Sequence, residues 1–384
     1  MVACWCSGVG WVGVLTVCLV LATSAGGVGR HVRMLAGGLA ARGVAVRVAG
    51  PAATEEAFGF AAVGARFTAV EIADRPRPAA DLTAVRRLRA LLRGVDAPRV
   101  VHAHGLRAAA LTALARGRRG AGRTPLVATL HNAPVTGGRV AAVYGVLERA
   151  VARRADRVLC VSPDLVDRMR ARGAVSVGRA MVPAPDLPLP ARGAAAIRAD
   201  LDAVTRPILL TVARLAPQKG LGTLLDAARH WRTRAEPPLV LIAGDGPQRA
   251  ELSARIEAEE LPVRLLGDRS DVADLLSVAD VVVVSSVWEG QPLIVQEALR
   301  VGRPIVATKT GGMPTMIGDG GVLVPSGDPA ALAAAVTRLL DDDRLSGVLA
   351  AKAATRGLTL PGERDAIDHA LGIYAELARF ETGR

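Results

Sequence analysis

The chain of 384 residues is poor in aromatic residues, cysteine and lysine. Phenylalanine, tyrosine and tryptophan make up only 3% of it, and no basic segment is interleaved with them. Single-stranded nucleic acid binds to such aromatic rings, so we expect no nucleic acid partner. The four cysteines match no zinc-binding spacing and favour a reducing compartment. We therefore expect a cytoplasmic protein.

Basic side chains outnumber acidic ones by 48 to 36, which gives a net charge of +12. This charge favours anionic partners such as nucleotides, phosphates or anionic lipid head groups. Arginine supplies nearly all of the positive charge, because the only lysines are Lys219, Lys309 and Lys352. A lysine in so arginine-rich a chain indicates a position that needs a compact ammonium group in place of a planar fork.

The first 29 residues carry no charged side chain. An uncharged apolar segment of this length is a candidate for a membrane span, but Gly8, Gly10 and Gly13 interrupt it and no basic segment precedes it. We predict a strand over residues 14–22 behind a loose extension over residues 1–13. A membrane anchor over residues 1–22 is the alternative.

Strand-like and helix-like segments alternate along the whole chain, which predicts α/β architecture with doubly wound parallel sheets. A proline-rich segment, "PAPDLPLPARG", interrupts this alternation and is typical of a linker. We expect Rossmann-like domains over residues 1–185 and 207–360, a linker over 186–206 and a cleft between the domains. A helix over residues 361–384 is expected to pack back toward the first domain.

Ligands of such sheets bind beyond the carboxyl ends of the strands, so the residues that follow each strand are the candidate site residues. Arg214 and Lys219 lie between the first strand of the second domain and the next helix. Two cations beside a helix N-terminus suit a diphosphate. The alternative for Lys219 is a solvated lysine at a helix start.

The segment "VWEGQPLIVQEALRVGRPIVATKTGG" contains Glu289 and Glu297 on either side of a predicted helix start. Backbone N–H groups of Leu293 and Ile294 could meet a phosphate there. Glu297 could accept two hydroxyl hydrogen bonds from a ribose, and Glu289 could meet the sugar end of the same ligand. A solvated helix face is the alternative for both glutamates.

In the first domain, Gly26, Gly27 and Gly29 follow the first strand, where they either form a tight turn or let a ligand approach the backbone. Three histidines lie at predicted strand ends, and each is either structural or functional: His102, His104 and His131.

Taken together, "SAGGVGRHV", "VVHAHG", "TLHN", "ADRVLCVSPDL", "VARLAPQKG", "LIAGDGP", "SVWEGQPLIVQEA" and "GRPIVATKTGG" resemble family 4 of the glycosyltransferases. These are retaining enzymes of the GT-B fold that use nucleoside-diphosphate sugars. The resemblance implies that Arg214 and Lys219 hold the donor diphosphate and that Glu297 holds the ribose. No metal or other cofactor is implied, because the cations and helix amides can stabilise the leaving nucleoside diphosphate.

The same resemblance implies that Glu289 and His131 line the donor sugar pocket and that Gly27 lies near the transferred group. The chain departs from the family where Thr315 replaces a usual glutamate and where "IGDGGVLV" is shorter than the usual glycine loop. These departures predict a changed sugar pocket rather than lost activity.

Three other functions are compatible with Rossmann-like domains. A nicotinamide oxidoreductase is disfavoured, because Val32 stands where the third glycine of its motif should be. A nucleotide-sugar 2-epimerase of the same fold and a non-catalytic nucleotide-binding protein stay open.

The segment Asp81–Gly94 places Leu82, Val85, Leu88 and Leu92 on one helical face and Arg86, Arg89 and Arg93 on another. Such a helix could rest on an anionic inner leaflet and bring the site to a lipid-linked acceptor. The alternative is an ordinary surface helix and a soluble sugar acceptor.

Overall fold

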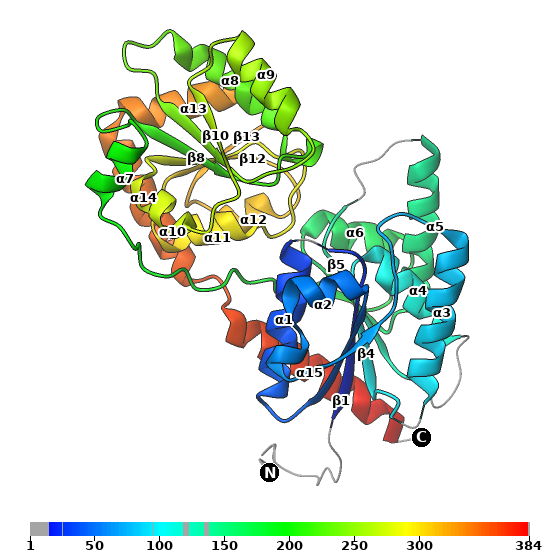
Figure 1. Cartoon of the computed structure of the whole chain (residues 1–384). Coiled ribbons are helices and arrows are strands. Elements are labelled where there is room, and N and C mark those ends of the chain that lie inside the picture. Colours follow the sequence, from blue (N-terminus) through cyan, green and yellow to red (C-terminus); the bar gives the residue numbers. More distant parts are fainter. Residues whose placement is uncertain (1–14, 25, 95, 118–122, 134–137, 383–384) are drawn as a thin grey trace. The chain divides into compact units, whose positions relative to one another are not determined.

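A computed structural model describes residues 15–24, 26–94, 96–117, 123–133 and 138–382 (Figure 1). The chain divides into two compact units. Unit 1 comprises Met1–Pro183 and Pro361–Arg384, and unit 2 comprises Ala184–Leu360. The extension expected over residues 1–13 lies outside the described residues. In the described ranges, no helix combines the length and the hydropathy needed to cross a bilayer.

Unit 1 is built on a parallel sheet with the strand order β3-β2-β1-β4-β5-β6-β7. The strands are β1 (Thr16–Leu21), β2 (Ala45–Gly50), β3 (Arg66–Ala69), β4 (Val100–His104), β5 (Leu126–Leu130), β6 (Arg157–Cys160) and β7 (Val177–Arg179). The order runs outward from β1 in one direction and from β4 in the other. The boundary between β1 and β4 is therefore the topological switch point, where ligands of such sheets bind.

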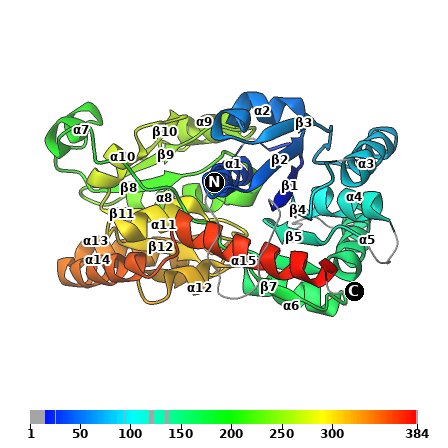
Figure 2. The same cartoon turned by 90° about the horizontal axis from the view of Figure 1, so that it is seen from below.

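The helices of unit 1 alternate with its strands along the chain. They are α1 (Gly27–Ala40), α2 (Ala52–Phe58), α3 (Pro78–Arg93), α4 (Leu106–Arg116), α5 (Gly138–Arg154), α6 (Pro163–Ala171) and α15 (Glu363–Thr382), with a short 3₁₀ helix, η1 (Ala61–Val63). Figure 2 shows α3, α4 and α5 side by side. The terminal helix α15 packs against α1 and reaches β4 (Figure 1).

Unit 2 repeats this plan with the strand order β10-β9-β8-β11-β12-β13. The strands are β8 (Ile208–Val212), β9 (Leu239–Ala243), β10 (Val263–Gly267), β11 (Val281–Val284), β12 (Ile305–Thr308) and β13 (Val322–Val324). All neighbours are parallel, so the switch point lies between β8 and β11.

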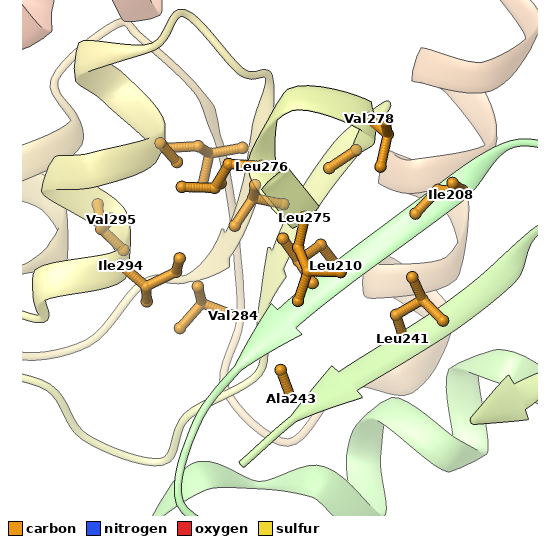
Figure 3. Packing of buried hydrophobic residues seen from close by; sticks show 14 of the residues in the cluster. Ile208, Leu210, Leu241, Ala243, Leu275, Leu276, Val278, Val284, Ile294 and Val295 are labelled. Atoms are coloured by element: carbon orange, nitrogen blue, oxygen red, sulfur yellow. The ribbon is translucent and has the colours of Figure 1, made fainter. Parts of the chain in front are cut away.

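The helices of unit 2 cover both faces of its sheet. They are α7 (Ala194–Asp200), η2 (Pro217–Lys219), α8 (Leu221–Arg232), α9 (Arg249–Ala258), α10 (Val272–Val278), α11 (Leu293–Arg300), α12 (Met313–Ile317), α13 (Pro329–Asp341) and α14 (Asp343–Leu358). Successive residues of β8 point to opposite faces: Leu209 packs with α8 and α13, whereas Leu210 packs with α10 and α11. Figure 3 shows the second of these clusters.

Residues 186–206, which we expected to form a linker, belong to unit 2. They contain α7, whose Ile197 is fully buried in the cluster shown in Figure 3. Proline stops regular structure only locally, and the buried apolar side chains of Ile197, Leu201 and Ala203 pack this segment into the core of unit 2.

The predicted α/β architecture with two doubly wound parallel sheets is confirmed. Three strands were not predicted: β3, β7 and β13. Each of them lies at a sheet edge and has only three or four residues, so its apolar pattern is too short to stand out.

The hydroxyl of Tyr374 anchors α15 to the sheet, because it lies 2.5 Å from Nδ1 of His102 in the middle of β4. Both side chains are buried. Tyr144, the only other tyrosine, makes an exposed hydrogen bond of 3.4 Å to the carbonyl oxygen of Asp74.

We predict that Tyr374→Phe lowers the free energy of unfolding by roughly 1 to 3 kcal/mol, because a buried imidazole nitrogen loses its partner. Tyr144→Phe is the matched control and should change it by less than about 0.5 kcal/mol. Denaturant unfolding and hydrogen exchange in α15 measure both effects. Equal losses in the two variants would contradict the anchoring role of Tyr374.

Candidate functional site

The switch point of unit 2 brings two loops together, one after β8 and one after β11. Three hydrogen bonds to backbone carbonyl oxygens join them. Oγ of Ser285 donates to the Lys219 carbonyl at 3.0 Å, the Val287 N–H donates to the Gln218 carbonyl at 2.8 Å, and Nε2 of Gln218 donates to the Trp288 carbonyl at 3.0 Å. The two loops therefore form one connected structure.

Within this structure, Nζ of Lys219 lies 2.6 Å from Oε1 of Glu289. The side chain of Lys219 is 24% exposed and that of Glu289 is 9% exposed, so the pair is largely shielded from solvent. Oγ of Ser286 donates to the same carboxylate oxygen at 2.7 Å. Oε1 is thus held from two sides, while Oε2 has no partner among the described residues.

Two glycines permit this close approach of the loops. Gly220 has φ +59°, and a Cβ atom there would lie 2.2 Å from the Ser285 carbonyl oxygen. Gly311 has φ +52°, and a Cβ atom there would lie 2.0 Å from the Glu289 carbonyl oxygen. Both positions combine a left-handed backbone with a backbone contact that a side chain would prevent.

Arg214 lies on the same loop as Lys219, but its side chain is exposed. Its guanidinium has no polar partner in the part of the chain that the structure describes. The backbone beside it is fixed, because the Leu215 N–H donates to the Asp245 carbonyl at 2.9 Å and Gly246 packs against Leu215. Because this backbone is fixed, the Arg214 side chain can reorient toward a ligand without any change in the loop.

The helix α11 begins directly after this loop. Pro292 is its N-cap residue, with φ −65°, and no side chain caps the terminus. Leu293 and Ile294 are its first two residues, so their N–H groups belong to the turn that has no intrahelical acceptors. Glu297 is half-buried one turn further along.

Thr315 is half-buried in α12, and its carbonyl oxygen accepts a hydrogen bond from Arg356.

In unit 1, the glycines after β1 differ in their surroundings. A Cβ atom on Gly29 would lie 2.1 Å from the Phe58 ring, so packing explains this glycine. A Cβ atom on Gly26 or Gly27 would meet no atom of the described residues within 4 Å. Packing does not require these two glycines, and Gly27 is the first residue of α1. An open glycine at a helix N-terminus leaves room for a ligand close to the backbone.

Four histidines gather at the switch point of unit 1: His31, His102, His104 and His131. Nδ1 of His104 lies 3.2 Å from Nε2 of His131. His102 is held by Thr129 at 2.7 Å as well as by Tyr374. The ring of His31 stands edge-on to those of His104 and His131, with centroids 5.5 and 5.6 Å apart.

Burial lowers the pKa of all four imidazoles, and for His31, His102 and His104 the neighbouring histidines lower it further. The pKa of His102 falls to about 3 and that of His131 to about 4. The cluster is therefore neutral at pH 7. Across the described ranges, no three histidine, cysteine or acidic side chains are placed to hold a metal ion together.

The structure brings Lys219 and Glu289 into contact and places Arg214 on the same loop, with Leu293, Ile294 and Glu297 on the following helix. His131 and Gly27 belong to unit 1. Sequence reasoning missed Ser286 and His31. The S-x-x-E spacing from Ser286 to Glu289 was a usable signal, because three residues span one tight turn. His31 lies one helical turn after Gly27, a spacing that places both near the same helix end.

Two family descriptions match the chain. "Glycosyl transferase 4-like domain" matches residues 26–185, and "Glycosyl transferases group 1" matches residues 206–342. Together these ranges cover most of both units.

Curated relatives match more locally. The alpha-D-kanosaminyltransferase of Streptomyces kanamyceticus is 34% identical over 178 residues, 45% of this chain and 46% of that protein. The amylovoran biosynthesis glycosyltransferase AmsK of Erwinia amylovora is 34% identical over 167 residues, 40% of this chain and 41% of that protein. The matched part of the chain thus spans less than half the length of these relatives.

Solved structures match over nearly the whole chain. Sucrose-phosphate synthase from Thermosynechococcus elongatus superposes with a TM-score of 0.77 at 21% identity, covering 94% of this chain and 99% of that one. Anabaena HepE in complex with UDP and glucose gives a TM-score of 0.76 at 20% identity, also covering 94% and 99%. At these identities the likeness establishes the fold.

We predict that Gly29→Ala lowers the free energy of unfolding by roughly 1 to 3 kcal/mol, because the new methyl group collides with Phe58. Gly27→Ala is the matched variant in the same helix and should change it by less than about 1 kcal/mol. Denaturant unfolding monitored by circular dichroism measures both. A large loss in Gly27→Ala would show that packing, and not an open ligand site, requires that glycine.

The neutral histidine cluster predicts that acid destabilises unit 1. A pKa below the unfolded value of 6.5 means that the unfolded chain binds more protons, so stability is present above pH 6.5 and is lost as pH falls toward the folded values. His102 alone should contribute a loss of about 2 kcal/mol between pH 7 and pH 5. Hydrogen exchange in β4 and β5 measures this loss. His230→Gln, at an exposed site in unit 2, should leave the pH dependence unchanged, and equal protection at both pH values would contradict the prediction.

Proposed function

Because the chain belongs to family 4 of the glycosyltransferases, with the GT-B fold, we propose that it transfers a sugar from a nucleoside-diphosphate sugar to an acceptor hydroxyl with retention at the anomeric carbon. The observation that carries the proposal is the Lys219–Glu289 pair beside the start of α11. It combines a shielded cation, an oriented carboxylate and an uncapped helix terminus. A cation and an uncapped helix N-terminus suit a diphosphate, and a carboxylate suits sugar hydroxyls.

Lys219 is the proposed ligand of the donor diphosphate. An ammonium group has three N–H donors, and Glu289 takes one of them. The other two can meet phosphate oxygens, so a single lysine can link the carboxylate to the diphosphate. An arginine directs its donors along a planar fork and would not share them in this way. Arg214, with its free guanidinium, is the proposed second cation.

The remaining donor contacts follow along α11 and in unit 1. The N–H groups of Leu293 and Ile294 are proposed to bind phosphate, and Glu297 the ribose hydroxyls. Oε2 of Glu289 is proposed to accept a hydroxyl hydrogen bond from the transferred sugar. His131 and Gly27 of unit 1 are the other proposed contacts to that sugar.

The proposed transfer breaks the bond between the anomeric carbon and the phosphate oxygen and forms a bond to the acceptor oxygen on the same face. A leaving-phosphate oxygen takes the acceptor proton. Arg214, Lys219 and the helix amides stabilise the negative charge that grows on the diphosphate. These groups supply the positive charge of the mechanism, so we propose that the reaction needs no divalent metal.

We expect the purified protein to release nucleoside diphosphate slowly from one member of a panel of UDP-glucose, UDP-N-acetylglucosamine and GDP-mannose, with EDTA present. Lys219→Ala should weaken donor binding about tenfold to a hundredfold, because a charge-assisted contact is worth roughly 1.5 to 3 kcal/mol. Lys219→Arg should also be impaired, whereas Lys352→Arg on the surface should not.

Binding of a nucleotide sugar without release of nucleoside diphosphate would favour a non-catalytic protein. Release of nucleoside diphosphate together with a sugar inverted at C2 would favour a 2-epimerase. A strict requirement for a divalent ion would contradict the proposed charge stabilisation. Normal kinetics in Lys219→Arg would remove the argument for lysine at this position.

We also propose that unit 1 binds peripherally to the anionic inner face of the cell membrane to reach a lipid-linked acceptor. The helix α3 exposes Arg86 and Arg93, and neither guanidinium has a polar partner among the described side chains and backbone. Leu82 on the same helix is 51% exposed, and Val143 and Val146 on α5 are 45% and 62% exposed. Exposed cations and an exposed leucine on one helix suit an anionic bilayer surface.

Two details of α3 differ from the expected helix faces. Leu82 is exposed, whereas Val85, Leu88 and Leu92 are buried against α4. Arg89 donates to the carbonyl oxygens of Leu114 and Ala115 at the end of α4, so its guanidinium is already engaged within the protein, unlike those of Arg86 and Arg93. The proposal therefore rests on Arg86 and Arg93.

We predict that the protein floats with phosphatidylglycerol vesicles at low salt and not with phosphatidylcholine vesicles. Replacing Arg86 and Arg93 with glutamine should weaken binding roughly thirtyfold, because each arginine contributes about 1 kcal/mol. Arg338 and Arg344, exposed in unit 2, provide a control pair with the same charge change. Equal recovery with both lipids, or equal loss in both double variants, would contradict membrane docking through α3.

A further inference from the structure

Two buried ring nitrogens of the histidine cluster have no hydrogen-bond partner among the described residues: Nδ1 of His31 and Nε2 of His104. We propose that His104 is a positioning residue that holds His131 in the tautomer with its proton on Nδ1, so that His131 offers a fixed N–H donor to a sugar oxygen. The sugar contact rests on the proposed function. The tautomer does not, because it follows from the hydrogen bonds of unit 1 alone.

Each ring of the cluster carries one N–H group and one bare nitrogen at pH 7. This follows from burial, which lowers the pKa of both His104 and His131 well below 7. A neutral imidazole donates from one nitrogen and accepts at the other, so the proton on one side of the ring fixes the role of the other side.

The contact of 3.2 Å between Nδ1 of His104 and Nε2 of His131 allows two arrangements. In the first, His104 donates from Nδ1, its Nε2 is bare, and His131 carries its proton on Nδ1. In the second, His131 donates from Nε2, and His104 then carries its proton on Nε2.

The surroundings of His104 favour the first arrangement. Its Nε2 is buried without a partner, so the second arrangement would leave a buried N–H group without an acceptor. Buried N–H groups without acceptors are rarer in proteins than incompletely satisfied acceptors. The nearest ring, that of His102 at a centroid distance of 4.1 Å, cannot help because both of its nitrogens are engaged by Thr129 and Tyr374.

His104 is also held rigidly enough to impose this choice. It is 1% exposed at the end of β4, and its ring lies between His102 and His131. His131 is the most exposed of the four at 9%, and its Nδ1 has no partner among the described residues. Ring and hydrogen-bond contacts thus connect the terminal helix with His131 through Tyr374, His102 and His104.

The consequence is a division of roles. A His131 with a proton on Nδ1 can donate to a hydroxyl or ring oxygen of the transferred sugar, but it cannot remove a proton through that nitrogen. His131 therefore contributes orientation rather than general base catalysis, which agrees with a mechanism in which a phosphate oxygen takes the acceptor proton.

The test is two-bond ¹H–¹⁵N correlation NMR of the histidine rings in the full-length protein, with His131 assigned through His131→Gln. We expect the wild-type His131 proton on Nδ1. In His104→Phe, which removes the partner, the proton should move to Nε2. In His104→Asn, whose amide nitrogen can replace Nδ1, it should stay on Nδ1. His230→Gln in unit 2 should change nothing, and circular dichroism checks that every variant folds.

A wild-type proton on Nε2 of His131, or a proton that stays on Nδ1 in His104→Phe, would overturn the proposal. Turnover of the donor found in the release assay should fall about tenfold in His104→Phe through kcat, and His104→Asn should recover most of it. If the NMR results are as expected and no donor is turned over, the proposed function fails while the tautomer assignment stands.

Discussion

The ion pair between Lys219 and Glu289 joins the two loops that meet at the switch point of unit 2. The Glu289 carboxylate is only 9% exposed, so removing Lys219 would leave a buried charge without its partner, which is destabilising. Ser286 binds the same carboxylate oxygen, and Gly220 and Gly311 let the backbones approach closely enough for these contacts. The free oxygen of Glu289 is therefore oriented before any ligand arrives. Such preorganisation is the main way in which enzymes stabilise charge.

The two units use different electrostatics at equivalent places in their folds. In unit 2 the loops beyond the strands carry charged groups, namely Arg214, Lys219 and Glu289. In unit 1 the corresponding place holds neutral imidazoles, because burial keeps the pKa of His102 and His131 at about 3 and 4. A nucleoside-diphosphate sugar has a charged end and a neutral end. Under the proposed function, the charged loops of unit 2 would suit a diphosphate, and the neutral imidazoles of unit 1 would suit a sugar.

Most of the fold could be predicted from the sequence, because inner parallel strands such as β9 and β11 are continuous apolar runs between segments of helical periodicity. The short edge strands could not, and the short helix α7 was missed because it directly follows the proline-rich segment and docks mainly through Ile197. For the candidate site, the position of Lys219 after a strand was readable. Its contact with Glu289 was not, because 70 residues separate the two in sequence and only the β8–β11 pairing brings them together. His31 was missed because a single helical histidine has no pattern beyond its spacing of one turn from Gly27.

The most direct test of the central claim is a crystal structure of the protein with the nucleoside diphosphate that the release assay identifies. The account predicts that a phosphate oxygen lies within hydrogen-bond distance of Lys219 Nζ while Lys219 keeps its contact with Glu289 Oε1. It also predicts that the phosphates face the first turn of α11. A diphosphate bound away from both Lys219 and Arg214 would contradict the account.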